Sequence, residues 1–221
     1  MGEGWWPGLA GRGRPRGFDR DAALERAMRV FWDLGYEATS MTDLTSAMGI
    51  GSPSLYAAFG SKEELFRESL RLYGATEGRT VTRALVEEPT ARAAVAAMLA
   101  TNARAYTEEA KPRGCMIVLS ATNCSEANAA VREHVAGVRK EGIDDLTRRL
   151  CQGVCDGDVP PGVDAATVAS FYSAVIQGMS VQARDGASRA DLERVAACAM
   201  AAWDAVVGDA VRPGSADEGT F

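Results

Sequence analysis

The sequence predicts an all-α protein, with a three-helix unit near its N-terminus and a larger helical part after it. Apolar residues recur at the spacing of an amphipathic helix along most of the 221 residues. Glycines, prolines and polar caps divide these stretches into pieces of helical length. The apolar run 115–121, CMIVLSA, could by itself form a strand. Because no partner strand accompanies it, we expect a short buried helix there.

The composition predicts a soluble cytoplasmic protein. Hydrophobic residues make up 47% of the chain, which is too many for a mainly disordered protein. No apolar run reaches the ~18 residues of a membrane span, and the N-terminus lacks the apolar core of a secretory signal. The net charge of −6 does not exclude nucleic acid, because binding depends on local charge. Residues 1–17 are expected to form a flexible basic arm with Arg12, Arg14 and Arg16, and the acidic excess is expected further along the chain.

The first two helices are marked by their ends. Asp19 can cap a helix that begins at Arg20, and Gly35 is expected to end that helix. Ser40 caps the next helix, with Asp43 at the third helical position as in a capping box. The apolar face of the first helix consists of Leu24, Ala27, Met28, Phe31 and Leu34.

A tight turn separates the second helix from a third. Gly49 can adopt the left-handed conformation that such a turn needs, and Ile50 fills the angle between the two helices. The third helix is expected at about 52–59, with Pro53 in its first turn, where a missing N–H group costs nothing. The residues of this helix that should pack inward are Leu55 and Phe59.

The remaining elements are all expected to be helices. Ser61 and Glu64 form a full capping box for the helix that follows the turn. Two prolines, Pro160 and Pro161, indicate a loop, which we place at 156–162. Further helices are expected at 90–109, 115–121, 125–155, 165–184 and 189–207.

Two short helices joined by a glycine turn are typical of a helix-turn-helix, whose second helix enters the major groove of DNA. Ser52, Pro53 and Ser54 open that helix and are best placed to meet base edges. Serine hydroxyls both donate and accept, so they discriminate weakly between bases. The free N–H groups at the start of the first helix of the motif, with Ser40 and Thr42, favour a phosphate.

A set of residues in 18–66 agrees in both spacing and type with a known family. These residues are Gly35-Tyr36-Glu37-Ala38-Thr39-Ser40-Met41, Leu44, Gly49-Ile50, Leu55-Tyr56, Phe59 and Ser61-Lys62-Glu63-Glu64-Leu65. On these positions the segment resembles the TetR (tetracycline repressor) family, whereas the rest of the chain matches only as a helical domain that ends in two long helices. The resemblance implies a homodimeric, usually repressing transcription factor that a small ligand releases from operator DNA.

The resemblance also implies phosphate contacts from Tyr56 and Lys62. Gly51, which we include among the DNA-binding residues, stands where relatives often carry Ser or Thr, so the recognition helix loses a side-chain cap. Ala57 and Ala58 stand where relatives often carry larger or polar residues. We therefore expect little direct readout, and the arginines of the arm compensate by entering the minor groove.

These observations divide the chain into a basic arm (1–17), a helix-turn-helix DNA-binding domain (18–66), a helical regulatory and dimerisation domain (67–207) and a disordered tail (208–221). Small residues on the last two helices would allow close approach of a second copy, in a four-helix interface. The alternative is that these helices only complete the core of one chain. The expected interface residues are Ala169, Ser170, Ser173, Ala174, Gly178, Ala197, Ala201 and Ala202.

A pocket for an unknown small-molecule effector should contain a few polar groups among apolar helices. His134 is the only histidine, and without a second histidine or a close cysteine cluster we expect neither a metal nor a cofactor. Ordinary packing is the alternative role for each candidate. The candidates are Met98, Asn102, Tyr106, Met116, Asn123, Phe171, Tyr172 and Gln177.

The five cysteines are odd in number and include no CxxC pair, which argues against a disulfide framework. We expect them to be small buried hydrophobes, and a thiol- or metal-responsive DNA-binding sensor is the alternative function. Operator release by peroxide that is lost when Cys115, Cys124, Cys151 and Cys155 are replaced by Ser would support that alternative. No catalytic motif stands out, so an enzyme is not expected. An architectural DNA binder is a third possibility, and a footprint on one palindrome would exclude it.

Overall fold

The computed structural model describes residues 18–208, except for the side chains of 80–82. All regular elements within 18–208 are helical, as expected. They are α1 (Arg20–Ala38), α2 (Met41–Met48), α3 (Ser52–Phe59), α4 (Lys62–Thr76), α5 (Arg79–Glu87), α6 (Ala91–Ala105), α7 (Met116–Leu119), η1 (Glu126–Asn128), α8 (Ala129–Asp156), α9 (Ala165–Arg184), α10 (Arg189–Ala201) and α11 (Trp203–Gly208). The expectations for the arm and for the tail after Gly208 concern residues outside this range.

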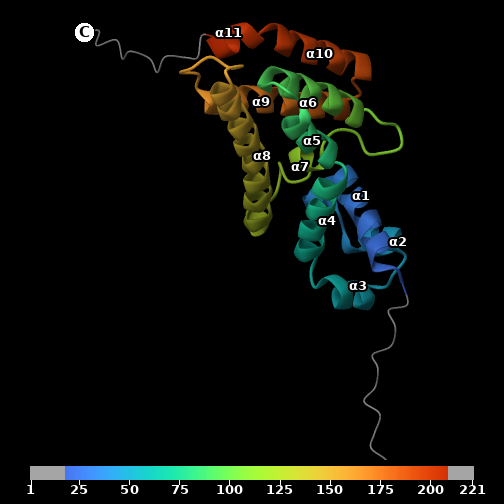
Figure 1. Ribbon diagram of the computed structural model, residues 1–221. Helices are drawn as coiled ribbons and strands as arrows, with labels where there is room; N and C mark the ends of the chain where they lie inside the picture. Colours follow the sequence, from blue (N-terminus) through green and yellow to red (C-terminus); the bar gives the residue numbers. More distant parts are fainter. Residues whose placement is uncertain (1–17, 209–221) are drawn as a thin grey trace, which may run out of the picture.

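The helices form an elongated body with the helix-turn-helix at one end (Figure 1). Helices α1 to α4 make up that end, and α3 is its outermost element. Helices α6, α9 and α10 lie together at the opposite end, while α8 runs along the body. The short α7 lies between the two ends, close to α1, α4, α8 and α9.

Helix α1 is bent at Gly35, where φ is 77° and ψ is 171°. Its regular part therefore stops at the expected glycine, but a further turn continues to Ala38. The bend frees the Tyr36 N–H group, which donates to the carbonyl oxygen of Ser120 at 2.7 Å. A Cβ atom at Gly35 would lie 3.2 Å from that same oxygen, so a side chain there meets both strain and crowding.

The helix-turn-helix follows the predicted boundaries. Ser40 and Asp43 form a reciprocal capping box, and Gly49 ends α2 in the left-handed conformation with φ of 69°. Helix α3 begins at Ser52, after the uncapped Gly51. One expectation is wrong: the Ser61 hydroxyl accepts the N–H of Glu64, but the reciprocal bond of a full capping box is not formed.

The later boundaries differ from expectation at three places. Helix α6 ends at Ala105 rather than 109, because the chain turns before Pro112 and Gly114. A 3-10 turn precedes α8, which therefore begins at Ala129 rather than 125. The last helix is divided at Ala202 into α10 and α11. Helix α9 and the short α7 lie where the sequence predicted them.

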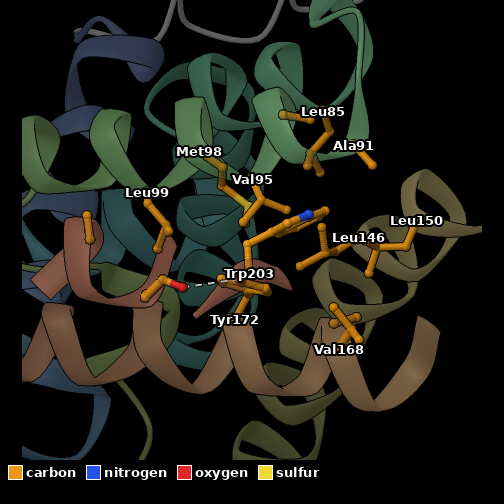
Figure 2. Packing of buried hydrophobic residues seen from close by; sticks show 14 of the residues in the cluster. Leu85, Ala91, Val95, Met98, Leu99, Leu146, Leu150, Val168, Tyr172 and Trp203 are labelled. Atoms are coloured by element: carbon orange, nitrogen blue, oxygen red, sulfur yellow. Dashed lines mark hydrogen bonds between the residues drawn. The ribbon is translucent and has the colours of Figure 1, made fainter. Parts of the chain in front are cut away.

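Two hydrophobic cores hold the described residues together. We call the helix-turn-helix domain formed by α1 to α4 the reader. Its hydrophobic core, the reader core, also includes Met116 and Ala121 from the α7 region and Val131 and Val135 from α8. The regulatory core joins α5, α6 and α8 to α11, with the Tyr172 hydroxyl donating to the carbonyl oxygen of Ala199 at 3.2 Å (Figure 2). The reader thus rests on segments that belong, by sequence, to the larger domain.

The bend at Gly35 yields a prediction about stability. Gly35→Ala should lower the free energy of unfolding by roughly 1–3 kcal/mol, because its backbone region is almost confined to glycine. Gly137→Ala is the matched control: this exposed glycine within α8 has free space around it, and the change should raise stability by about 0.5–1 kcal/mol. Urea unfolding measures both. Equal effects of the two changes would contradict a special role for the bend.

Candidate nucleic-acid interface and pocket

Helix α3 presents a polar edge to solvent. Leu55 and Phe59 are buried against the reader core, as predicted from their spacing. Ser52, Pro53 and Ser54 are all exposed at the start of the helix. This polar edge matches the side of a recognition helix that reaches into a groove.

Further predicted contacts lie within α3 itself, at Tyr56, and at the start of α2. The Tyr56 side chain is 49% exposed, so its hydroxyl is available to a phosphate. Thr42 is exposed in the first turn of α2. Ser40 is also exposed, but its hydroxyl donates to the Asp43 carboxylate at 2.6 Å and its backbone N–H donates to the same group at 2.8 Å. These two hydrogen bonds lower the pKa of the Asp43 carboxyl. The start of α2 therefore carries its own negative charge beside the N–H groups.

The cations of the reader are engaged within the protein. Arg20 forms an ion pair with Glu68 at 2.8 Å and lies 4.3 Å above the centre of the Phe59 ring. The Lys62 ammonium lies 4.4 Å above the Tyr36 ring, and partial burial lowers its pKa. These contacts position α1, α3 and α4 relative to one another, and they leave little free positive charge on this surface.

The reader domain is acidic. Residues 18–66 contain four Arg and Lys residues against eight Asp and Glu residues, so the negative charge does not lie only further along the chain, as we expected. The positive excess lies in 1–17, with Arg12, Arg14 and Arg16 against Glu3. Those arginines fall outside the described residues.

A cavity of about 320 Å³ lies between the reader and the regulatory helices. Of the eight ligand candidates, Met98, Asn102, Tyr106 and Gln177 line it. Sequence analysis missed the other lining residues, among them Trp32, Tyr73 and Cys115 from α1, α4 and the α7 region. No local signal marks these three residues, because the chain brings them together from distant segments.

The other four candidates lie elsewhere. Met116 is fully buried in the reader core, and Tyr172 in the regulatory core. Asn123 is exposed on the loop before α8. Phe171 is 39% exposed on the outer face of α9. These four residues therefore do not line the cavity.

The proposed dimer residues separate into three groups. Ser170, Ala174, Ala197 and Ala201 are exposed on α9 and α10. Gly178 and Ala202 are half-buried, while Ser173 lines the cavity. Ala169 is fully buried within the chain, because it faces the regulatory core, so it cannot form the outer surface of α9.

The cysteines are less buried than predicted. Cys151, Cys155 and Cys198 are exposed, and Cys115 and Cys124 are half-buried.

No group of three or more potential metal ligands occurs among residues 18–208. His134 is half-buried near Arg67 and Arg71, and its pKa is lowered first by burial and then by the charge of Arg67. No helix in the described part of the chain is long and apolar enough to cross a membrane.

A capped helix-turn-helix with an exposed polar recognition helix, joined to a larger helical domain with a cavity between the two, is typical of ligand-responsive DNA-binding regulators. Comparison with known proteins agrees with this class. Residues 23–69 match the model of the bacterial regulatory proteins of the tetR family, and residues 91–199 match the tetracyclin repressor-like C-terminal domain. The chain belongs to the TetR family of transcriptional regulators.

Relatives cover nearly the whole chain. The HTH-type transcriptional repressor ComR of Escherichia coli (strain K12) is 37% identical over 89% of this chain and 94% of its own. The repressor BdcR of the same strain is 30% identical over 88% of this chain and 92% of its own. The solved structure of a cysteine mutant of the regulator CifR, complexed with 26-bp operator DNA, has a TM-score of 0.84 and 45% identity. It covers 86% of this chain and all of the CifR chain.

A polar junction ties the reader to the larger domain and yields a prediction about pH. The Glu37 carboxylate accepts hydrogen bonds from the Ser125 hydroxyl at 2.8 Å and from the Asn128 amide at 2.9 Å, which lower its pKa from 4.5. A lowered carboxyl pKa stabilises the fold above the ordinary value, and that contribution is lost as the pH falls through the folded-state pKa.

Glu37→Gln should therefore lower the melting temperature at neutral pH, and the difference from the unsubstituted protein should shrink below pH 4.5. Thermal unfolding followed by circular dichroism across this range measures the effect. Glu133→Gln, at an exposed carboxylate on α8, is the control and should change little. A Glu37→Gln difference that stays constant with pH would contradict this assignment.

Proposed function

We propose that this protein binds a palindromic operator as a homodimer, represses transcription there and leaves the DNA when a small molecule fills the cavity between its two domains. The observation that carries the proposal is the exposed polar start of α3, held at the end of the molecule farthest from α10. The domain limits of 18–66 and 67–207, with flanking arm and tail, and a cytoplasmic location are parts of the same proposal. So is the absence of catalysis, which turnover of a ligand by the purified protein would contradict.

Base reading in this proposal is modest. Ser52, Pro53 and Ser54 meet base edges, while Ser40, Thr42 and the backbone of Gly51 approach phosphates. Because the reader is acidic and its cations are engaged, the arginines of the arm supply most of the free positive charge. They enter the minor groove beside each half-site, which adds affinity and sensitivity to groove width. Removal of residues 1–16 should therefore weaken operator binding, and unchanged affinity at several salt concentrations would contradict this role of the arm.

Two copies associate through α9 and α10 in this proposal. The exposed faces of these helices carry small side chains, including Ser170 and Ala174 on α9 and Ala197 and Ala201 on α10. Val181, which is 46% exposed, and Phe171 extend the apolar character of α9. Gly178 and Ala202 border the same faces. A two-fold axis between the copies sets the separation of the two copies of α3 and thus the half-site spacing.

Release follows from the position of the cavity. Its wall includes Trp32 of α1 and Tyr73 of α4, both of which also belong to the reader core. A ligand that moves these helices changes the distance between the two recognition helices. DNA and ligand then favour different conformations, with a coupling free energy of typically ~1–3 kcal/mol.

Selection of bound fragments from a random DNA pool tests the central proposal. The recovered sequences should share a palindrome, with half-site centres about 34–36 Å apart or at a multiple of that distance. Footprinting on one recovered fragment should protect both half-sites. Recovery of unrelated sequences would overturn the proposal in favour of an architectural DNA binder.

Two substitutions separate a hydrogen bond to phosphate from a charge contact. Tyr56→Phe should weaken operator binding by about 1 kcal/mol, roughly fivefold, without changing its salt dependence, because no charge is removed. Lys62→Gln should reduce the slope of log K against log salt by about one. Fluorescence anisotropy at several salt concentrations measures both. An unchanged slope would assign Lys62 only to its structural contact with Tyr36.

The dimer surface is tested by charge. Ala174→Glu combined with Ala201→Glu places carboxylates on both proposed interface helices. In a symmetric dimer the carboxylates of the two copies would lie close together and repel one another. Light scattering during gel filtration should then report one chain rather than two. Ala136→Glu on the exposed side of α8 is the control and should leave the mass unchanged. A double variant that remains dimeric would place the interface elsewhere.

A further inference from the structure

The last turn of α9 holds α1 directly, without α4 between them. Arg184, the final residue of α9, donates from Nη2 to the Trp32 carbonyl oxygen and from Nη1 to the Asp33 carbonyl oxygen, each at 2.7 Å. The two bonds join residues that are 152 and 151 positions apart in the sequence. A helix of the proposed dimer surface is therefore attached to the first helix of the reader.

The bend at Gly35 makes one of these carbonyls available. In an unbroken helix the Trp32 carbonyl would accept the N–H group of Tyr36, four residues further on. The bend turns that N–H group to the Ser120 carbonyl, and the Trp32 carbonyl accepts from Arg184 instead. A cation at this point is also favoured by the partial negative charge of the carbonyls at the end of a helical segment.

The guanidinium group suits this contact better than an ammonium group would. Its planar fork presents two donors side by side, whereas a lysine offers one point of charge. The buried Nε atom of Arg184 has no hydrogen-bond partner among the described residues, so the attachment depends on the two Nη atoms. The Asp33 carboxylate adds a longer ionic contact, with its Oδ1 atom 3.5 Å from Nη1.

A second set of bonds closes a ring around the same junction. The Trp32 indole N–H donates to the Gly114 carbonyl at 3.1 Å. The N–H group of Cys115 donates to the Ser180 hydroxyl, one turn before Arg184 on α9, at 2.9 Å. A Cβ atom at Gly114 would lie 2.7 Å from the Ser180 carbonyl oxygen, so this segment is packed directly on α9. The two connections together hinder rotation of α1 against α9.

The angle between α1 and α9 matters because the recognition helix lies far from the dimer helices. Figure 1 shows α3 at the end of the molecule opposite to α9 and α10. A small rotation at the junction therefore moves α3 by a larger distance. One base pair added between two half-sites separates them by ~3.4 Å and rotates one against the other by roughly 35°. A dimer with fixed readers meets only one such arrangement.

We propose that Arg184 is a specificity-determining positioning residue, which sets the half-site spacing that the dimer accepts by fixing the angle of each reader to α9. The inference rests on the proposed function and adds a determinant of operator choice that belongs to α9 rather than to the recognition helix. It is separate from the reading of bases by Ser52, Pro53 and Ser54, which a change at Arg184 leaves in place.

Operators that differ only in spacing test this assignment. The palindrome recovered by fragment selection is rebuilt with one or two base pairs added or removed between its half-sites, and fluorescence anisotropy measures the affinity of the full chain for each. The unsubstituted protein should prefer the selected spacing. Arg184→Met keeps an unbranched stem and removes both donors. It should reduce that preference by roughly three- to tenfold, because the reader is then free to rotate.

A conservative exchange and a matched control complete the series. Arg184→Lys keeps the charge but not the fork, so its spacing preference should lie between those of Arg184→Met and the unsubstituted protein. Arg83→Met removes an exposed arginine of α5 that pairs with Glu87 at 3.0 Å, and it should leave the preference unchanged. Fragment selection with Arg184→Met should return the same half-site sequence. If Arg184→Met does not form a folded dimer, the comparison is made with Arg184→Lys.

Two outcomes would overturn the inference. An equal loss of affinity at every spacing would assign Arg184 only to the stability of the fold, and an unchanged spacing preference would assign the reader angle to another contact. Both leave the proposed function standing, because the unsubstituted protein still binds its palindrome. Failure of the unsubstituted protein to recover any palindrome is a distinct result and would overturn the proposed function itself.

Discussion

The aromatic packing between α1 and α4 is the contact on which the rest of the structure depends. Phe31 and Phe66 meet edge to face, with ring centres 5.0 Å apart, and Tyr36 lies 5.0 Å from Phe66. Directly after Phe31 in the chain, Trp32 meets Tyr73 of α4 at 4.9 Å. This packing fixes the angle of α4 against α1, and α4 in turn presents α3. The same Trp32 and Tyr73 form part of the cavity wall, so the reader cannot be repacked without a change in the cavity.

Sequence reasoning worked best where the determinants are local. Caps and glycines identified α1 to α3, including the left-handed Gly49, because each signal lies within four residues of the boundary that it sets. The same reasoning failed at Ala202, where the division of the last helix follows from packing of Trp203 into the regulatory core. It failed also for Ala169, because a small residue at helical spacing can face either the core or solvent.

The cavity was only partly predictable. Asn102 and Tyr106 stand out as polar groups within an apolar helix, and both line the wall. Trp32 and Cys115 join them from segments 80 or so positions apart in the sequence, through long-range contacts that have no local signature. Cys115, expected to be a small buried hydrophobe, packs against both cores but is only half-buried.

The acidic surface of the helix-turn-helix unit affects how the regulator behaves among an excess of non-cognate DNA. Unspecific attachment to a duplex is driven almost entirely by cations displacing counterions, and residues 18–66 carry twice as many acidic as basic side chains. This unit therefore adds little to retention by the bulk chromosome, and the sequence-independent attraction is left to the arginines of 1–17. A larger fraction of the molecules is then free to find cognate sites.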